Sequence, residues 1–377
     1  MRILSAIITI FLASWVSSAQ ELGNIARNSA RATVSPEVKG DTVVFRFQAD
    51  YATIVQLKGT WSLPDAEPMR MYKDFNGLWE LSVVGLRPDL YSYYFIVDGV
   101  RTFDPNNTLV RRDGTEYENF LYLNGPRTTN YKAASQRGTV SHIWYQSREL
   151  GGSRRLTVYT PYGYEKNRTK YYPVLYLLHG EGQDEESWLS IGSAAQILDN
   201  LIHSGRAVPM IVVMPNGNAD QQASDKLGLP RTDPKFVTKD SFTNSLVKEI
   251  IPFVEKNYRV LSKKSMRGIA GVDMGGHQAL DACILRPELF DYMCFLGSGE
   301  KSRESLQSDL LRIKKPKFKL IWQGCGVSDA AYNDVKNLHD ELETVAMDNT
   351  MYISDGGHEW RNWRLYLSNF VPILFKY

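Results

Sequence analysis

The chain has 377 residues, of which 43% are hydrophobic and 23% charged, and this ordinary composition excludes a largely disordered protein. Lys and Arg total 44 against 42 Asp and Glu, a formal net charge of +2 that argues against a dedicated nucleic-acid binder. The length corresponds to two or three domains at about 150 residues each. Aromatic residues make up 12% of the chain, which favours β-rich cores or, as a weaker alternative, a sugar-binding surface.

The N-terminal stretch, residues 1–19, has the pattern of a cleavable signal peptide. Arg2 precedes an apolar run from Ile3 to Ala13, and the small residues Ser17-Ser18-Ala19 suit a signal-peptidase site before Gln20. The run is shorter than the roughly 20 apolar residues that span a bilayer. We therefore expect residues 1–19 to be a signal peptide and the protein to be exported, periplasmic or secreted, without a membrane anchor. A buried N-terminal helix is the alternative.

Short apolar runs separated by turn residues fill residues 35–123. The expected strands lie at 41–48, 54–57, 78–83 and 91–97. Strands at this spacing predict an antiparallel β-sandwich. Residues 124–137 lack apolar periodicity and are predicted to be a linker.

Compact apolar strands alternate with helical stretches in residues 138–377. The expected strands lie at 155–159, 174–178, 210–214, 269–271, 295–296 and 318–322, and the clearest helices at 241–256 and 276–286. This alternation predicts an α/β domain with a doubly wound, mostly parallel sheet and helices on both faces.

The three cysteines, Cys283, Cys294 and Cys325, each stand in an apolar context. An odd number cannot pair completely, so free buried thiols are favoured over a disulfide framework. No Cys/His cluster has the spacing of a zinc site. We expect neither a metal nor a cofactor.

A glycine-rich junction at Gly271-Val272-Asp273-Met274-Gly275, followed by Gly276, joins an expected strand to an expected helix. Small residues on both sides permit the sharp turn of a nucleophile elbow, which lifts the central side chain above the sheet beside a helix N-terminus. An ordinary glycine-rich junction is the alternative.

Three further stretches favour the elbow. His179-Gly180 ends a strand, and a backbone N–H just beyond it can supply half of an oxyanion hole. Asp329 follows a late strand, and His358 stands on a glycine-rich turn after the last strand. Elbow, acid and histidine in this chain order are typical of α/β-hydrolases.

The C-terminal region, residues 139–377, resembles the esterase D-like hydrolases, and most of all the feruloyl and acetyl-xylan esterases of carbohydrate esterase family one. The motifs that carry the resemblance are Tyr172–Trp188, Pro215-Asn216-Gly217, Ile250–Phe253 and Gly356–Trp363. The resemblance implies an α/β-hydrolase fold and, as the partner, an acylated plant polysaccharide or oligosaccharide such as acylated xylan.

The N-terminal region is similar to immunoglobulin-like early-set modules of the glycogen-binding type. The similarity is carried by Lys58–Trp61, Gly77–Glu80, Tyr91–Gly99 and Asp104-Pro105. Such modules can stack aromatic rings on sugars. The alternative for Trp61 and Trp79 is that they pack the sandwich or its interface.

Carried over by position, the resemblance makes His358 the catalytic base and Asp329 the acid that orients it. It makes the backbone N–H groups of Glu181 and Met274 the oxyanion hole. The family has Ser at the elbow, whereas this chain has Asp273.

Aromatic and acidic side chains near these motifs have two readings each. Trp188 and Trp360, and also Trp363, would line an acyl or sugar pocket, with core packing as the alternative. The carboxylate of Glu181 would lie near the oxyanion site or turn to solvent.

An aspartate at the elbow is a poor replacement for serine in ester hydrolysis. Its attack would form a mixed anhydride, and because its conjugate acid has a pKa near about 4, the carboxylate would leave before the alcohol. Losing the serine of such a triad lowers kcat about a millionfold. We therefore expect esterase activity to be lost or strongly reduced.

Three alternatives to simple loss of activity remain. Asp273 can act as a general base that activates water, in an esterase that is active by a non-standard route. It can attack saturated carbon, as in dehalogenase-like hydrolases. The protein can also be a carbohydrate-binding pseudo-esterase in which Asp273 and His358 form an ion pair.

Overall fold

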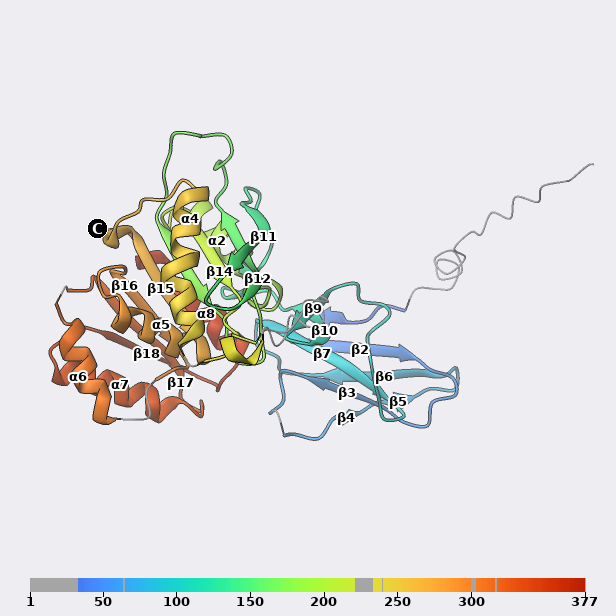
Figure 1. Ribbon diagram of the computed structural model, residues 1–377. Helices are drawn as coiled ribbons and strands as arrows, with labels where there is room; N and C mark the ends of the chain where they lie inside the picture. The colour runs from blue at the N-terminus through green and yellow to red at the C-terminus, as the bar shows by residue number, and fades with distance from the viewer. Residues whose placement is uncertain are drawn as a thin grey trace, which may run out of the picture.

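The computed structural model describes residues 33–63, 65–220, 233–238, 240–299, 303–315 and 317–376. The expected signal peptide, residues 1–19, lies outside the described residues. An N-terminal part made of strands lies beside a larger C-terminal part in which helices flank a sheet (Figure 1). No helix among the described residues has the length and apolarity needed to cross a membrane.

The N-terminal part consists of two antiparallel sheets, ordered β1-β2-β6-β5 and β4-β3-β7-β10-β9, with β8 paired to β7. Its strands are β1 (Glu37–Lys39), β2 (Thr42–Gln48), β3 (Val55–Gly59), β4 (Met69–Arg70), β5 (Tyr72–Lys73), β6 (Leu78–Val83), β7 (Leu90–Val97), β8 (Val100–Thr102), β9 (Val110–Asp113) and β10 (Glu116–Tyr122). The four strands expected from the sequence are β2, β3, β6 and β7. We call this part the N-terminal sandwich, because its two sheets share one core.

The core of the N-terminal sandwich follows the two-residue period of its strands. Phe45 on β2, Leu57 on β3 and Phe95 on β7 are fully buried between the sheets. Trp79 is also buried, and the ring of Trp61 lies 5.3 Å from that of Phe45. Both indoles therefore pack the sandwich, which is the second of the two roles considered for them.

Residues 124–137, the predicted linker, pack against the rest of the chain. They contain the short helix η3 (Thr128–Tyr131), and Thr128 Oγ1 donates to the Leu123 carbonyl at 3.0 Å. Tyr131 is buried together with Leu90 and Phe120 of the sandwich in the core of the C-terminal part. The segment predicted to be a linker therefore contains a short helix and one buried aromatic anchor, Tyr131, although its sequence has no apolar periodicity.

The C-terminal part is built on one eight-stranded sheet, ordered β11-β12-β14-β13-β15-β16-β17-β18. β12 runs antiparallel to β11 and β14, and the remaining pairs are parallel, as the sequence predicts for a mostly parallel sheet. The strands are β11 (Thr139–Ser147), β12 (Gly152–Thr160), β13 (Val174–Leu178), β14 (Ile211–Pro215), β15 (Arg267–Val272), β16 (Tyr292–Leu296), β17 (Leu320–Gly326) and β18 (Thr350–Ser354).

Both faces of this sheet are buried. On β13, Val174, Tyr176 and Leu178 belong to one core, and Leu175 and Leu177 to the other. Such strands are covered by helices on either side. This explains why the central strands appear in the sequence as unbroken apolar runs.

Helices cover both faces of the sheet. Against one face lie α2 (Ala194–His203) and α8 (Trp360–Phe370), which bury residues three or four apart, such as Trp363 and Leu367. Against the other lie α3 (Ser241–Ser245), the π-helical η6 (Leu246–Ile250), α4 (Ile251–Asn257), α5 (Met274–Leu285), α6 (Arg303–Ile313) and α7 (Tyr332–Thr344). The helices expected at 241–256 and 276–286 are α3 to α4 and α5. The short elements are α1 (Ser187–Ser190), η5 (Pro234–Phe236), η7 (Lys264–Met266) and η8 (Val371–Ile373).

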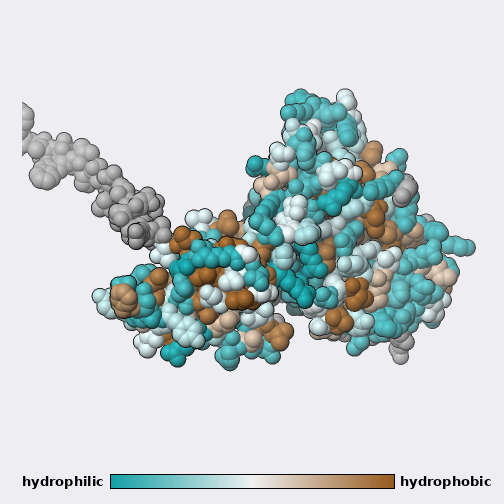
Figure 2. Space-filling model, turned by 180° about the vertical axis from the view of Figure 1, so that it is seen from behind, coloured by the Kyte–Doolittle hydropathy of each residue, from teal (hydrophilic) through white to brown (hydrophobic). Residues whose placement is uncertain are grey.

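The two parts form separate lobes that meet along one flank (Figure 2). Arg361 Nε of α8 donates to Asp89 Oδ2 of the sandwich at 2.9 Å, and Arg111 Nη1 of β9 donates to the Ile191 carbonyl at 2.9 Å. Leu90 and Phe120 extend the core of the C-terminal part into the sandwich. The contact is therefore buried and well bonded.

Cys283, Cys294 and Cys325 are free and buried, as expected. Among the described residues, no group of three His, Cys, Asp or Glu side chains could hold a metal ion.

Candidate active site

Asp273 stands at the sharp corner between β15 and α5. Its φ of 47° and ψ of −118° are unusual for a residue with a side chain and cost about 1–3 kcal/mol. A Cβ on Gly271 would lie 2.1 Å from the Gly275 carbonyl oxygen, and one on Gly276 would lie 2.4 Å from Ser298 Cβ. The corner thus has the tight geometry that the glycines predict.

The register of the parallel strands brings the loop after β13 to this corner. Leu178 lies opposite Gly271, so the residues after each strand end side by side. The loop, residues 179–193, joins β13 to α2, and we call it the donor loop because the Glu181 N–H donates to Asp273 Oδ2 at 3.0 Å. Met274 is the first residue of α5, where backbone N–H groups lack intrahelical acceptors. Asp273 therefore occupies the backbone donor that the family resemblance leads us to expect for an oxyanion.

The residue Glu181 is exposed. Of the two readings considered for its side chain, the structure therefore favours the turn to solvent.

His358 and Asp329 form a hydrogen-bonded pair at the ends of β18 and β17. His358 Nδ1 lies 3.1 Å from both Asp329 carboxylate oxygens, and the Asp329 side chain is only 1% exposed. The hydrogen bond to Asp329 raises the pKa of His358, and the charges of Asp329 and Asp273 add to the effect against the lowering by burial. The structure thus brings Asp273, Asp329 and His358 to one edge of the sheet.

Gly297 is a site residue that the sequence reasoning missed. Its φ is +54°, and a Cβ there would lie 2.9 Å from Asp329 Oδ2 and 3.2 Å from His358 Nδ1. The signal was present in Gly297-Ser298-Gly299, which follows β16 at the same edge, but glycines in a turn after a strand are common.

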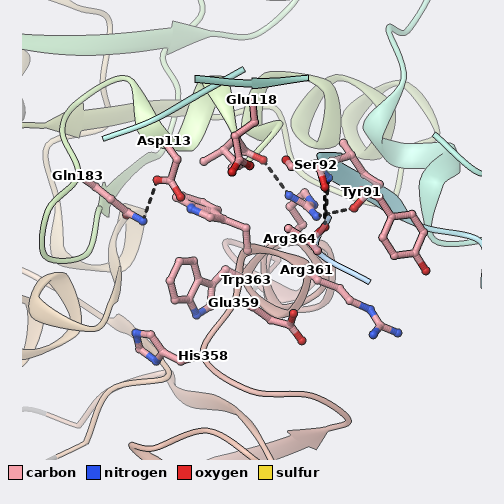
Figure 3. A pocket seen from close by; sticks show the side chains of 14 residues that line it. Tyr91, Ser92, Asp113, Glu118, Gln183, His358, Glu359, Arg361, Trp363 and Arg364 are labelled. Carbon is pink, nitrogen blue, oxygen red and sulfur yellow. Dashed lines mark hydrogen bonds between the residues drawn. The ribbon is translucent and has the colours of Figure 1, made fainter. Parts of the chain in front are cut away.

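A cavity of about 270 Å³ opens beside His358 and is lined by both parts of the molecule (Figure 3). The sandwich contributes Ser92, Asp113 and Glu118, among others, and the C-terminal part contributes Gln183, Glu359 and Trp363. Burial raises the pKa of Asp113 to about 6 and also raises that of Glu118. Sequence reasoning missed these acids, because nothing local relates a sandwich strand to a histidine near the other end of the chain.

The tryptophans divide between cavity and core. Trp360 and Trp363 line the cavity while being largely buried, and the Trp363 ring lies edge-on to His358 at 5.0 Å. Trp188 is 1% exposed, lies outside the cavity lining, and donates through Nε1 to the Leu178 carbonyl at 3.0 Å. Trp188 therefore does not line the pocket as expected: it packs under Trp360, whose ring is 5.2 Å away.

Comparison with known proteins finds esterases among the proteins similar to this chain. Residues 147–374 match the Esterase family, described as "Putative esterase". The endo-1,4-beta-xylanase/feruloyl esterase of Xylanibacter ruminicola is 31% identical over 312 residues, which are 81% of this chain but only 41% of that protein.

Solved structures give the same fold. A ferulic acid esterase of Anaeromyces mucronatus, in complex with ferulic acid, has a TM-score of 0.57 and 25% identity, over 67% of this chain and 96% of its own. An enterobactin esterase of Shigella flexneri has a TM-score of 0.68 over 89% of this chain and 93% of its own. At 17% identity, the second likeness shows the fold alone.

Proposed function

This chain belongs to the Esterase family, and on that premise we propose that it is an esterase-type protein directed to acylated plant polysaccharide such as xylan, with serine-esterase turnover lost or strongly reduced. The name of the Xylanibacter ruminicola relative and the ferulic acid bound in the Anaeromyces mucronatus structure support this ligand class. His358 would be the base, Asp329 its orienting acid, and the N–H groups of Glu181 and Met274 the oxyanion donors. The ligand would reach them through the cavity beside His358.

The single observation that carries the loss of turnover is the hydrogen bond from the Glu181 N–H to Asp273 Oδ2. An oxyanion hole stabilises negative charge that develops only in the transition state. A carboxylate already bonded to that donor competes for it and repels the developing charge. The Glu181 N–H therefore already has a hydrogen-bond acceptor before any substrate binds.

The electrostatics of His358 support the same conclusion. A general base must be unprotonated to accept a proton, and its efficiency is greatest when its pKa lies near the working pH. Two carboxylates raise the pKa of His358, which favours the imidazolium. An ion-paired His358 is a poor base for a hydroxyl or a water.

The organisation of the chain is part of the proposal. Residues 35–123 would be an early-set module and residues 138–377 the hydrolase, in an exported protein from which residues 1–19 are removed. The buried Tyr131 joins the predicted linker to the core of the C-terminal part.

The decisive experiment compares wild type with Asp273→Ser on methyl ferulate and an aryl acetate. We expect a gain of at least about a thousandfold in kcat/KM, because serine restores a nucleophile that can form an acyl-enzyme, with His358 placed to protonate the departing alcohol. Wild-type turnover equal to that of Asp273→Ser would overturn the claim. Intact-mass analysis with alkyl halides would reveal an alkyl-aspartate if Asp273 attacked saturated carbon.

A further inference from the structure

The donor loop is bonded to the sandwich through Arg112. Arg112 of β9 contacts both carboxylate oxygens of Asp184 at 2.8 Å, and the two side chains are 9% and 0% exposed. The Arg112 N–H donates to Ser190 Oγ at 2.7 Å. One sandwich strand thus holds the loop at two places.

A shorter path leads from β9 to the donor itself. Gln183 Nε2 donates to Asp113 Oδ1 at 3.3 Å, and Figure 3 shows the two side chains directed at each other. Gln183 Oε1 in turn accepts from the Gly180 N–H at 3.1 Å. Gly180 directly precedes Glu181, whose N–H reaches Asp273. Two hydrogen bonds and one peptide unit therefore separate the sandwich from the oxyanion donor.

The two backbones also approach closely. Gly114 follows β9 with φ +54°, and a Cβ there would lie 2.2 Å from the Gly182 carbonyl oxygen. From the other side, Asn218 Nδ2 donates to the Gln183 carbonyl at 2.6 Å. The donor loop contacts the sandwich at Gly114 and the segment after β14 at Asn218, so its conformation depends on both.

We propose that Asp113, acting through Gln183, is a positioning residue that sets the Glu181 N–H in place, with Arg112 anchoring the same loop through Asp184. The kinetic consequence rests on the proposed function, whereas the structural consequence does not. The sandwich then completes the active site and is more than an appended binding module.

The size of the effect follows from what Asp113 does. Without an acceptor at position 113, the Gln183 amide can rotate, and the Gly180 N–H loses its fixed partner. Misplacing a catalytic group by about 1 Å can cost about a hundredfold in rate, and removing an oxyanion donor costs at least as much. Loosening the donor through one intermediate side chain should cost about tenfold.

Amide hydrogen exchange in the full chain with Asp273 retained tests the positioning directly. Asp113→Leu should raise the exchange of Gly180 and Glu181 by about tenfold or more. Asp113→Asn keeps an Oδ1 acceptor for Gln183 and should restore protection to within about twofold of wild type. Glu116→Leu removes an exposed carboxylate of the same sandwich and serves as the matched control. No change in Asp113→Leu, or an equal rise throughout the chain, would overturn the proposal.

Kinetics in the Asp273→Ser chain test the consequence. Asp113→Leu should lower kcat about tenfold with KM within about twofold, and Asp113→Asn should return kcat to the level of the parent. An equal loss in Asp113→Asn would contradict the hydrogen-bond path. If Asp273→Ser itself hydrolyses no ester, the proposed function fails, and the exchange experiment alone decides the positioning.

Discussion

The corner at Asp273 differs from the neighbouring pair of His358 and Asp329. The corner is held by the packing of its backbone glycines, whereas the pair is held by a hydrogen bond between its side chains. At the corner, the steric demands fall on Gly271, Gly275 and Gly276, which contact each other or neighbouring strands. The side chain at 273 is not needed for that packing. In the pair, the two side chains are hydrogen-bonded to each other, and Gly297 leaves room for them.

The difference shows that fold and chemistry can separate at one residue. The turn is specified by its flanking glycines, so it places little demand on the identity of the side chain at 273. The Asp329 carboxylate, by contrast, is almost fully buried, so removing His358 would take away one of its hydrogen-bond partners, leaving the Ala331 N–H, in a site where burial is costly. The following predictions test this contrast.

The largest effect is expected for His358→Ala in the Asp273→Ser chain. If the pair is chemically intact, the regained ester hydrolysis should fall by about 10⁵–10⁶-fold, because triad members act as a unit. Steady-state rates on methyl ferulate measure this, with His277→Ala on α5 as the control that should stay within about tenfold. Survival of the activity in His358→Ala would mean that the pair is not the base.

Gly297→Ala should damage the pair while leaving the corner intact. The added Cβ meets Asp329 Oδ2 at 2.9 Å, and φ +54° is strained for alanine, so we expect a loss of about 1–3 kcal/mol in the free energy of unfolding. In the Asp273→Ser chain, kcat should fall about a hundredfold through misplacement of His358. Denaturant titration and kinetics measure the two effects. If Gly297→Ala changed neither the free energy of unfolding nor kcat, the site would have space for a Cβ beside Asp329 and His358.

NMR titration of His358 compares the influence of the two carboxylates. Both Asp329→Asn and Asp273→Asn should lower the pKa of His358, and Asp329→Asn should lower it further, because its hydrogen bond is the leading cause of the rise. The reverse order would make Asp273 the principal partner of His358. It would then favour a direct ion pair at the corner.

The sequence predicted more of the scaffold than of the cavity. The central strands β13 and β14 are unbroken apolar runs bounded by turn residues, so their existence follows from local pattern. The glycines around Asp273 likewise encode the turn in five consecutive positions. What local pattern cannot give is which of the buried tryptophans lines the cavity: Trp188 and Trp360 are both buried, yet of these two only Trp360 lines it.

The contribution of the sandwich was also beyond the sequence. Asp113 ends an ordinary strand, and its meeting with Gln183 depends on how the two parts dock. That docking is determined by buried side chains such as Tyr131, in a segment without periodicity. Long-range contacts of this kind have no signature within the short windows over which hydrophobic periodicity is read.

The smallest effect is expected in the pH dependence of stability. Because the pKa of His358 is raised in the folded state, the native protein binds the proton more tightly than the unfolded chain. Its stabilising contribution is complete below the unfolded pKa of about 6.5 and is lost as the pH rises through the folded value. The His358 side chain is 35% exposed, so solvent screening should keep the change under about 1 kcal/mol.

Urea titrations of wild type and His358→Gln between about pH 5.5 and 8.5 resolve this change as a difference in slope. Wild type should lose stability relative to His358→Gln as the pH rises. Asp273→Asn, which removes one of the two charges, should retain most of the slope, and Asp329→Asn should retain little of it. Equal slopes in wild type and His358→Gln would mean that Asp329 and Asp273 do not stabilise the His358 imidazolium. The corner and the pair would then not differ in their electrostatic effect on His358.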